Sequence, residues 1–153
     1  MPGPGEYVPD PTEGVEHVED LPEPHKKIRR RDKKSARCPD CNAPSPRRRA
    51  GVRTLHDFGN IDTGRPVDIE FHYSVHRCPE CGKYFSVDMS DVAAPHSHYT
   101  GRVVLRAVRY VVEDGSPYRD ASWRLWRDHR VFVPFATIQN WVEAAGEKNT
   151  LEN

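Results

Sequence analysis

The sequence predicts an α+β protein of small modules: a β-ribbon of the zinc-ribbon type, then a three-helix unit, after a disordered N-terminal tail. Three observations support this fold class. All four cysteines lie in two Cys-x2-Cys pairs, the segment between the pairs alternates between apolar and polar residues, and the segment after them carries apolar residues at helical spacing. We expect the tail to span residues 1–36, the zinc ribbon residues 37–90 and the helical unit residues 99–147.

The tail is predicted from its charge pattern. The chain has 153 residues, 30% of them charged, and a formal net charge of +0 that hides a split. Residues 1–24 carry seven acidic side chains and no lysine or arginine, whereas residues 26–53 carry twelve lysines and arginines against two aspartates. Blocks of like charge are usually disordered, and basic blocks commonly bind nucleic acid. Three arginines of the basic block are expected to contact DNA: Arg47, Arg48 and Arg49.

The composition argues against a membrane protein or a secreted one. The sequence has no run of about 18 apolar residues, the length needed to span a bilayer. Its first residues have neither the basic start nor the apolar run of a secretory signal. We therefore expect a cytoplasmic, nucleoid-associated protein without a membrane partner. In the cytosol, paired cysteines more often hold a metal than form disulfides.

The clearest strand lies between the cysteine pairs, over residues 66–77. Its apolar residues face one side and its polar residues the other, as in a half-buried strand. The apolar set is Val67, Ile69, Phe71, Tyr73 and Val75. Residues 51–58 are typical of a preceding strand, residues 58–66 supply the turn, and residues 83–89 predict a short third strand.

Three helices are expected after the strands. The first lies in residues 101–115, where Gly115 ends it, and its apolar spacing is that of an amphipathic helix. Ser116 and Pro117 begin the second helix as N-cap and first-turn residue. The third helix begins at Pro134 and ends at Gly146. Three short helices with tight connections are enough for a helix-turn-helix unit.

The cysteine pairs predict a metal site. Each Cys-x2-Cys pair places two sulfurs on one tight turn, and two such turns complete the four-thiolate set that structural Zn²⁺ accepts. Gly82, and Asn42 in the first pair, stand where a left-handed backbone lets amides point at the sulfurs. We expect one structural Zn²⁺ with four ligands: Cys38, Cys41, Cys78 and Cys81. These thiolates leave no position for a catalytic water.

Other roles for the cysteines and histidines fit the pattern less well. A redox pair would need a βαβ context, and a disulfide framework would need secretion. A second metal site at the histidines would need carboxylate neighbours or helical spacing, so these side chains are expected at the surface. The histidines concerned are His72, His76, His96 and His98.

The helical unit offers candidate contacts to double-stranded DNA. The third helix is expected to bury Ile138, Trp141 and Val142. Its outer face then carries side chains that can bond base edges or phosphates: Thr137, Gln139 and Asn140. Arginines on and after the second helix are placed for backbone phosphates: Arg124, Arg127 and Arg130.

The order of these motifs resembles a known family. CPDC, a basic stretch, a two-strand ribbon, RCPECGKYFSV and helices ending in TIQNWV are similar to the N-terminal part of bacterial insertion-sequence transposases, over residues 37–146. In that family a zinc ribbon precedes a helix-turn-helix, and a DDE catalytic domain with an RNase H-like fold follows. The resemblance implies that the four cysteines bind zinc and that residues 134–145 recognise transposon ends.

The sequence departs from that family after Gly146, where only EKNTLEN follows. A DDE domain needs three carboxylates on its own scaffold to hold two Mg²⁺ ions. We therefore expect a DNA-binding protein that is not an enzyme, and whether copies of the chain associate stays open. The alternative is a zinc-ribbon module that docks proteins or regulates transcription. Its contact would be made by aromatic side chains: Tyr73, Tyr84 and Trp141.

Overall fold

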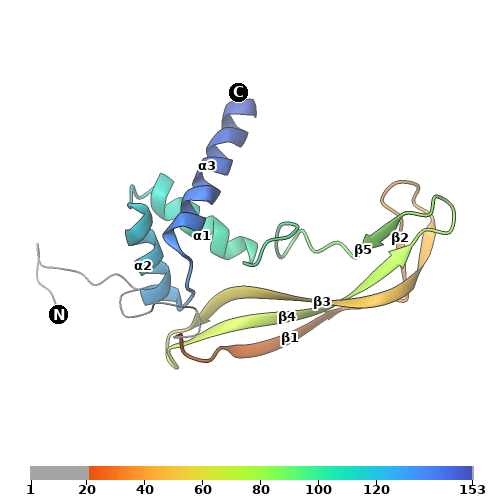
Figure 1. Ribbon diagram of the computed structural model, residues 1–153, viewed down its shortest axis with the longest axis horizontal. Helices are drawn as coiled ribbons and strands as arrows, with labels where there is room; N and C mark the ends of the chain where they lie inside the picture. Colours follow the sequence, from red (N-terminus) through yellow and green to blue (C-terminus); the bar gives the residue numbers. More distant parts are fainter. Residues whose placement is uncertain (1–20, 153) are drawn as a thin grey trace, which may run out of the picture. The chain divides into compact units, whose positions relative to one another are not determined.

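The computed structural model describes residues 21–152, and their side chains up to residue 147 (Figure 1). The strands are β1 (His25–Arg31), β2 (Ser35–Arg37), β3 (Pro44–Asn60), β4 (Arg65–Arg77) and β5 (Tyr84–Ser86). The helices are α1 (Gly101–Val112), α2 (Tyr118–His129) and α3 (Phe135–Glu152).

The described chain divides into two compact units. The first, which we call the sheet unit, comprises residues 26–56 and 68–101. The second, which we call the helical unit, comprises residues 21–25, 57–67 and 102–152.

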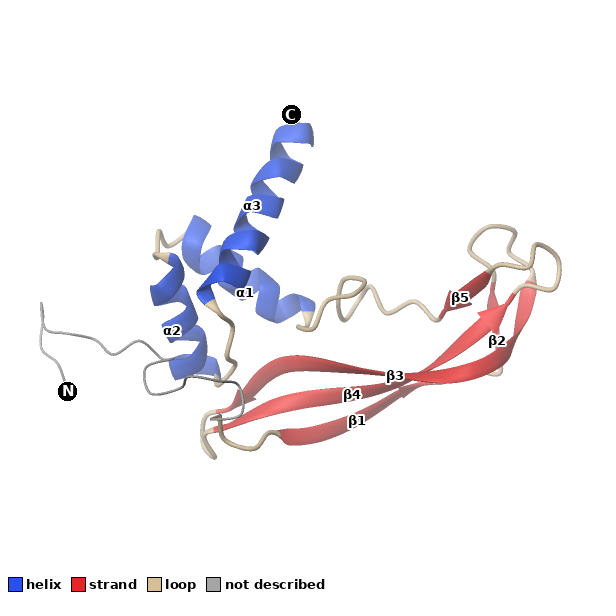
Figure 2. Cartoon of the chain, viewed as in Figure 1, coloured by secondary structure: helices blue, strands red, loops and turns tan. Residues whose placement is uncertain are grey.

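The strands form one mixed sheet in the order β1-β4-β3-β2, with β5 also paired to β4 (Figure 2). The pairs β2–β3 and β4–β5 are antiparallel, with Arg37 opposite Pro44 and Arg77 opposite Tyr84. Two hydrogen bonds show that β1 runs parallel to β4. Arg65 Nε donates to Glu23 O near the start of both strands, and Ser74 Oγ donates to Arg31 O near the end of both. The two short strands, β2 and β5, are thus the strands that border the cysteine turns.

The core of the sheet unit confirms the predicted alternation of β4. Ile69, Phe71 and Val75 on one face are buried, and they are joined by Val87 and Met89 from the segment after β5. The polar residues of the opposite face are half-buried as far as His72, but Ser74 and His76 are buried and Tyr73 of the apolar face is only half-buried, so the alternation does not hold at that end of the strand. A strand with one buried face and one partly solvated face is what its period of two requires.

The helical unit has three helices at the predicted places. Val103 and Ala107 of α1, Leu125 of α2 and Ile138 of α3 are buried. The connection between α2 and α3 is fixed where Ser122 Oγ donates to Val133 O at 2.6 Å. Helix α2 packs on α3. Within residues 21–152, no helix is long and apolar enough to cross a bilayer.

Two helix boundaries differ from the prediction. Pro117, not Ser116, caps the start of α2, and Ser116 Oγ instead accepts a hydrogen bond from Arg124. Helix α3 continues through Gly146 to Glu152. One glycine inside a helix costs only about 1 kcal/mol, so the other residues of the helix outweigh it.

The predicted fold class is wrong. The described residues form a five-stranded mixed sheet and, after it in the sequence, three helices, not a zinc ribbon followed by a helix-turn-helix unit. The largest error lies in the segment expected to be disordered, because His25–Arg31 and Ser35–Arg37 form strands. Every residue of β1 from Lys26 to Arg30 is exposed, so the side chains stay solvated while the backbone pairs with β4. Residues 1–20 of the expected tail lie outside the described residues.

Candidate metal centre

Two turns with the same backbone hydrogen bonds carry the four cysteines. Residues 38–43 connect β2 to β3, and residues 78–83 connect β4 to β5. In each turn the first cysteine N–H donates to the carbonyl five residues later, at 3.0 and 2.9 Å, and its own carbonyl accepts the N–H four residues later, at 2.9 Å in both. Each turn joins two antiparallel strands, β2 to β3 and β4 to β5, and their pairing holds this geometry in place.

The residue after the second cysteine of each turn has a left-handed backbone, as predicted. Asn42 has φ of 60° and Gly82 has φ of 77°. Glycine takes this conformation without strain, and asparagine is among the side chains that tolerate it best. The chain can therefore turn tightly enough to point both sulfurs of a pair toward one position.

The four sulfurs lie close together, and the arrangement can hold a metal ion. The Sγ–Sγ distances are 3.3 Å for Cys41–Cys78, 3.6 Å for Cys38–Cys81 and 3.9 Å for Cys41–Cys81. All four sulfurs lie within 4.8 Å of one another. Metal–sulfur bonds of about 2.3 Å in a tetrahedron would separate the sulfurs by about 3.8 Å. The observed spacing is close to that value.

Local hydrogen bonds favour an ionised ligand at this cluster. The Cys81 amide lies 3.5 Å from Cys78 Sγ, and its hydrogen bond is the main reason why the pKa of the Cys78 thiol is lowered to about 6. The pKa of Cys41 is raised to about 12, because the Ala43 backbone bond, which lowers it, is outweighed by hydrogen bonds to the other sulfurs and by burial. Cys38 and Cys78 are buried, whereas Cys41 and Cys81 are exposed. Thiolates are the form in which cysteine binds metals.

An ion pair connects the two turns outside the cluster. Lys83 Nζ lies 3.0 Å from Asp40 Oδ2, and the hydrogen bond to this carboxylate raises the pKa of Lys83. Both side chains are well exposed, so the pair contributes little to stability. Its position shows that the two turns face each other.

His76 supports the cysteine turns from the interior of the sheet unit. The side chain is fully buried, with Nε2 2.8 Å from Ser74 Oγ and Nδ1 3.0 Å from Ser45 O. Its ring stacks on Phe85 with centroids 5.5 Å apart. The expectation that His76 lies at the surface is therefore wrong, because Ser45 of β3 and Phe85 of β5 cover the polar face of β4 at this point.

The other histidines are placed differently. His72 Nε2 lies 3.0 Å from Glu70 Oε1 on β4, and His56 Nδ1 lies 2.7 Å from Asp68 Oδ1. His96 and His98 are exposed, as expected, on the segment after β5.

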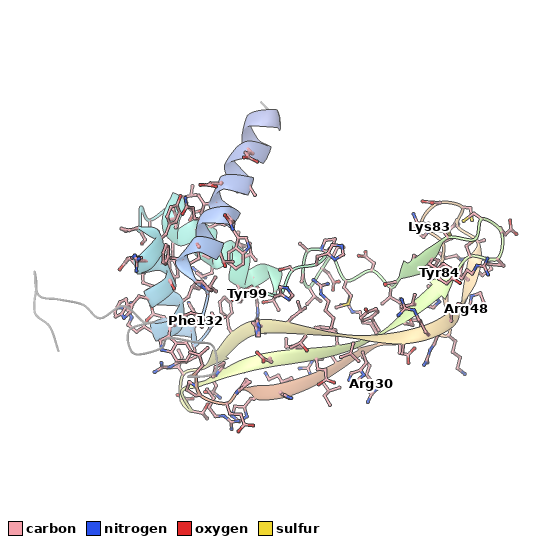
Figure 3. All side chains as sticks on the ribbon, viewed as in Figure 1. Arg30, Arg48, Lys83, Tyr84, Tyr99 and Phe132 are labelled. Atoms are coloured by element: carbon pink, nitrogen blue, oxygen red, sulfur yellow. The ribbon has the colours of Figure 1, made fainter. Side chains whose placement is uncertain are left out.

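The predicted DNA-contacting arginines of β3 are all exposed. Arg47 pairs with Asp32 at 2.7 Å, whereas the structure shows no carboxylate partner for Arg48 or Arg49 among the described residues. The basic residues of the segment expected to be a tail lie in β1 and in the connection from β1 to β2. Figure 3 shows Arg30 and Arg48 pointing away from the sheet. The exposed basic residues of β1 are Lys26, Lys27, Arg29 and Arg30.

The predicted arginines of the helical unit are occupied by contacts within that unit. Arg124 donates to Ser116 Oγ at 2.7 Å, and Arg127 lies 3.8 Å above the ring of Trp123 while it binds Asp128. Arg130 stacks on Trp126 at 4.8 Å and has a buried Nε without a hydrogen-bond partner. These three guanidiniums therefore have less freedom to reach phosphates than the solvated arginines of β3.

The polar residues predicted on α3 lie at its surface to different degrees. Asn140 is exposed, whereas Thr137 and Gln139 are half-buried. Gln139 Nε2 donates to Glu143 Oε1 at 3.0 Å. Ile138 is buried as expected, and Trp141 and Val142 are half-buried.

No family model, no curated protein and no solved structure matches this chain. The resemblance to insertion-sequence transposases, and the contacts to DNA inferred with it, therefore stay predictions.

Proposed function

We propose that the chain binds one structural Zn²⁺ through its four cysteines and holds double-stranded DNA with the basic strands of the same unit. The observation that carries this proposal is the convergence of four sulfurs from two matching turns. Soft thiolates favour zinc among common cellular divalent ions, and a four-cysteine tetrahedron is a closed site. The ion would thus act in folding rather than catalysis.

The folding role follows from the short strands that border the turns. Strands β2 and β5 have three residues each. Three residues provide few backbone hydrogen bonds and little buried area of their own. Binding of structural zinc contributes on the order of 10 kcal/mol to small domains, so it would supply the missing stability.

DNA binding is supported by the charge of the sheet unit. This unit carries fourteen lysines and arginines against seven carboxylates, a formal charge of +7. Four thiolates with one Zn²⁺ would lower that charge to +5. The unit therefore has a strong positive field although the whole chain is neutral, and such a field attracts polyanions.

Salt dependence tests the proposal. If roughly six phosphates are neutralised, the logarithm of affinity should fall with the logarithm of salt with a slope of about −5. Fluorescence anisotropy of a short labelled duplex, titrated with zinc-loaded protein at several salt concentrations, measures this slope. Transposon-end duplexes are the first to try because of the family resemblance.

A matched pair of variants shows which unit binds. Arg48→Gln removes an exposed charge of β3, and Arg109→Gln removes an exposed charge of α1 that pairs with Glu113 at 3.0 Å. We expect only Arg48→Gln to reduce the slope, by about 0.9. Equal effects of both variants, or no binding to duplex DNA at low salt, would reject the proposal.

Protein docking is the second candidate, favoured by one observation. Tyr84, labelled in Figure 3, follows the second cysteine turn and is 58% exposed. The guanidinium of Arg77 lies 5.5 Å from the centre of its ring. Exposed tyrosine and arginine are common anchors at protein interfaces. A partner that stays bound to the wild-type protein after nuclease treatment, and is lost with Tyr84→Ala, would support docking instead of DNA binding.

A further inference from the structure

The sheet unit contains a groove that the proposed contacts to duplex DNA do not use. It has a volume of about 850 Å³ and lies between β3, β4 and the segment that follows β5. This volume is within the range of small-molecule sites, roughly 300–1,000 Å³. Buried apolar residues form part of its lining: Val87, Met89 and Ala93.

Arg53 of β3 gives the groove a positive charge. Its Nη2 donates to Ala94 O at 2.6 Å and to Ser97 O at 2.7 Å. Both hydrogen bonds use one nitrogen, and no carboxylate pairs with this guanidinium among the described residues. A half-buried guanidinium held by neutral carbonyls keeps a full charge and free N–H groups, which suit a phosphate.

The groove also has an aromatic wall. The ring of Tyr73 packs directly on Gly51, where an added Cβ would lie 2.4 Å from Tyr73 Cζ. A side chain at position 51 would displace the end of this ring, which lines the groove. Aromatic side chains in such positions stack on planar bases and do so with any base.

Two histidines complete the polar rim. His96 and His98 line the groove and are exposed. His96 has a left-handed backbone, with φ of 62°, and precedes Ser97, one of the two Arg53 acceptors. The one carboxylate in the lining, Asp88, already accepts the Ser90 N–H at 2.9 Å.

We propose that this groove binds a nucleotide, with its phosphate on Arg53 and the rim histidines and its base against Tyr73. The ligand is either a free nucleotide or an unpaired nucleotide within a single strand, since both present the same phosphate and base. This site does not depend on duplex binding by β1 and the exposed arginines of β3.

Isothermal titration of the full-length, zinc-loaded protein tests the groove with AMP, adenosine, inorganic phosphate and a short single-stranded oligonucleotide. We expect AMP to bind at least about tenfold more tightly than adenosine or phosphate, because charge-assisted hydrogen bonds and stacking act together. An oligonucleotide that binds more tightly than AMP, and whose affinity falls in Arg53→Gln, identifies the single strand as the source of the ligand. Equal or weaker binding, or tighter binding that Arg53→Gln leaves unchanged, identifies the free nucleotide as the ligand of the groove.

Variants locate the binding. Arg53→Gln should weaken AMP binding at least about tenfold. His96→Gly relieves the left-handed backbone, so the fold is preserved while AMP binding falls a few-fold. Arg48→Gln lies outside the groove and should leave AMP binding unchanged while it weakens duplex binding.

Absence of AMP binding to folded wild-type protein would overturn the proposal. So would unchanged AMP affinity in both Arg53→Gln and His96→Gly. Loss of AMP binding in Arg48→Gln would show that nucleotide and duplex share one surface, which also contradicts a separate groove.

Discussion

Loss of the buried His76 side chain should weaken the sheet unit strongly. This residue of β4 bonds to Ser45 of β3, stacks on Phe85 of β5 and accepts or donates a hydrogen bond with its own neighbour Ser74. One side chain thus connects three strands directly beside the cysteine turns. The change to test is His76→Ala.

The expected loss follows from these contacts. The two hydrogen bonds contribute about 1 kcal/mol each. Removal of the buried ring also leaves a cavity, and Ser45 O and Ser74 Oγ lose their partner. These effects add about 1–2 kcal/mol. The free energy of unfolding should therefore fall by about 3–4 kcal/mol.

Urea unfolding of zinc-loaded protein, followed by circular dichroism, measures this loss against His72→Ala. His72 is half-buried and its polar partner among the described residues is Glu70, so its replacement should cost less than about 1 kcal/mol. With an m-value near 2 kcal/mol/M, the urea midpoint should fall by about 1.5–2 M for His76→Ala and by less than about 0.5 M for His72→Ala. Equal shifts for the two variants would refute the role given to His76.

Three further predictions concern two glycines of the strands and turns, an ion pair and the cysteine cluster. Gly51→Ala should lower the free energy of unfolding by about 1–3 kcal/mol, because its Cβ would meet the Tyr73 ring at 2.4 Å. Gly64 has φ of 71° and open space around it, so Gly64→Ala should cost only about 1 kcal/mol, from backbone strain. Urea unfolding that shows a larger loss of stability for Gly64→Ala than for Gly51→Ala would contradict these two explanations. The hydrogen bond from Arg31 lowers the pKa of Asp91 in the folded protein. The ion pair therefore stabilises the fold when the pH is above about 4, the ordinary pKa of an aspartate, and this stability is lost as the pH falls below that value. Stability of Asp91→Asn should therefore decline less than that of wild type on acidification, and parallel declines would argue against the pair. The four thiols should react with a thiol reagent only after a strong chelator is added, and rapid reaction without chelator would argue against a bound metal.

Several elements were predictable because their signals are local. The period of two in β4, the helical spacing of α1 and the Cys-x2-Cys turns with Asn42 and Gly82 depend on residues close in sequence, and the structure shows all of them. The clustering of the sulfurs was predictable for the same reason, since the ribbon between the pairs brings its ends together.

The remaining features depend on partners distant in sequence. The β1 strand has the composition of a disordered segment, and only parallel pairing with β4, about 40 residues later, makes it a strand. His76 lies on a polar face that looks solvated until Phe85 and Ser45 cover it. The groove at Arg53 forms only because residues 87–98 return to β3 and β4.

The metal content of the purified, folded chain tests the central claim most directly. We expect elemental analysis to find one zinc per chain in wild-type protein and less than one in Cys78→Ser, with loss of secondary structure when a strong chelator removes the ion. Folded protein that contains no zinc and keeps its circular dichroism spectrum in chelator would contradict the account.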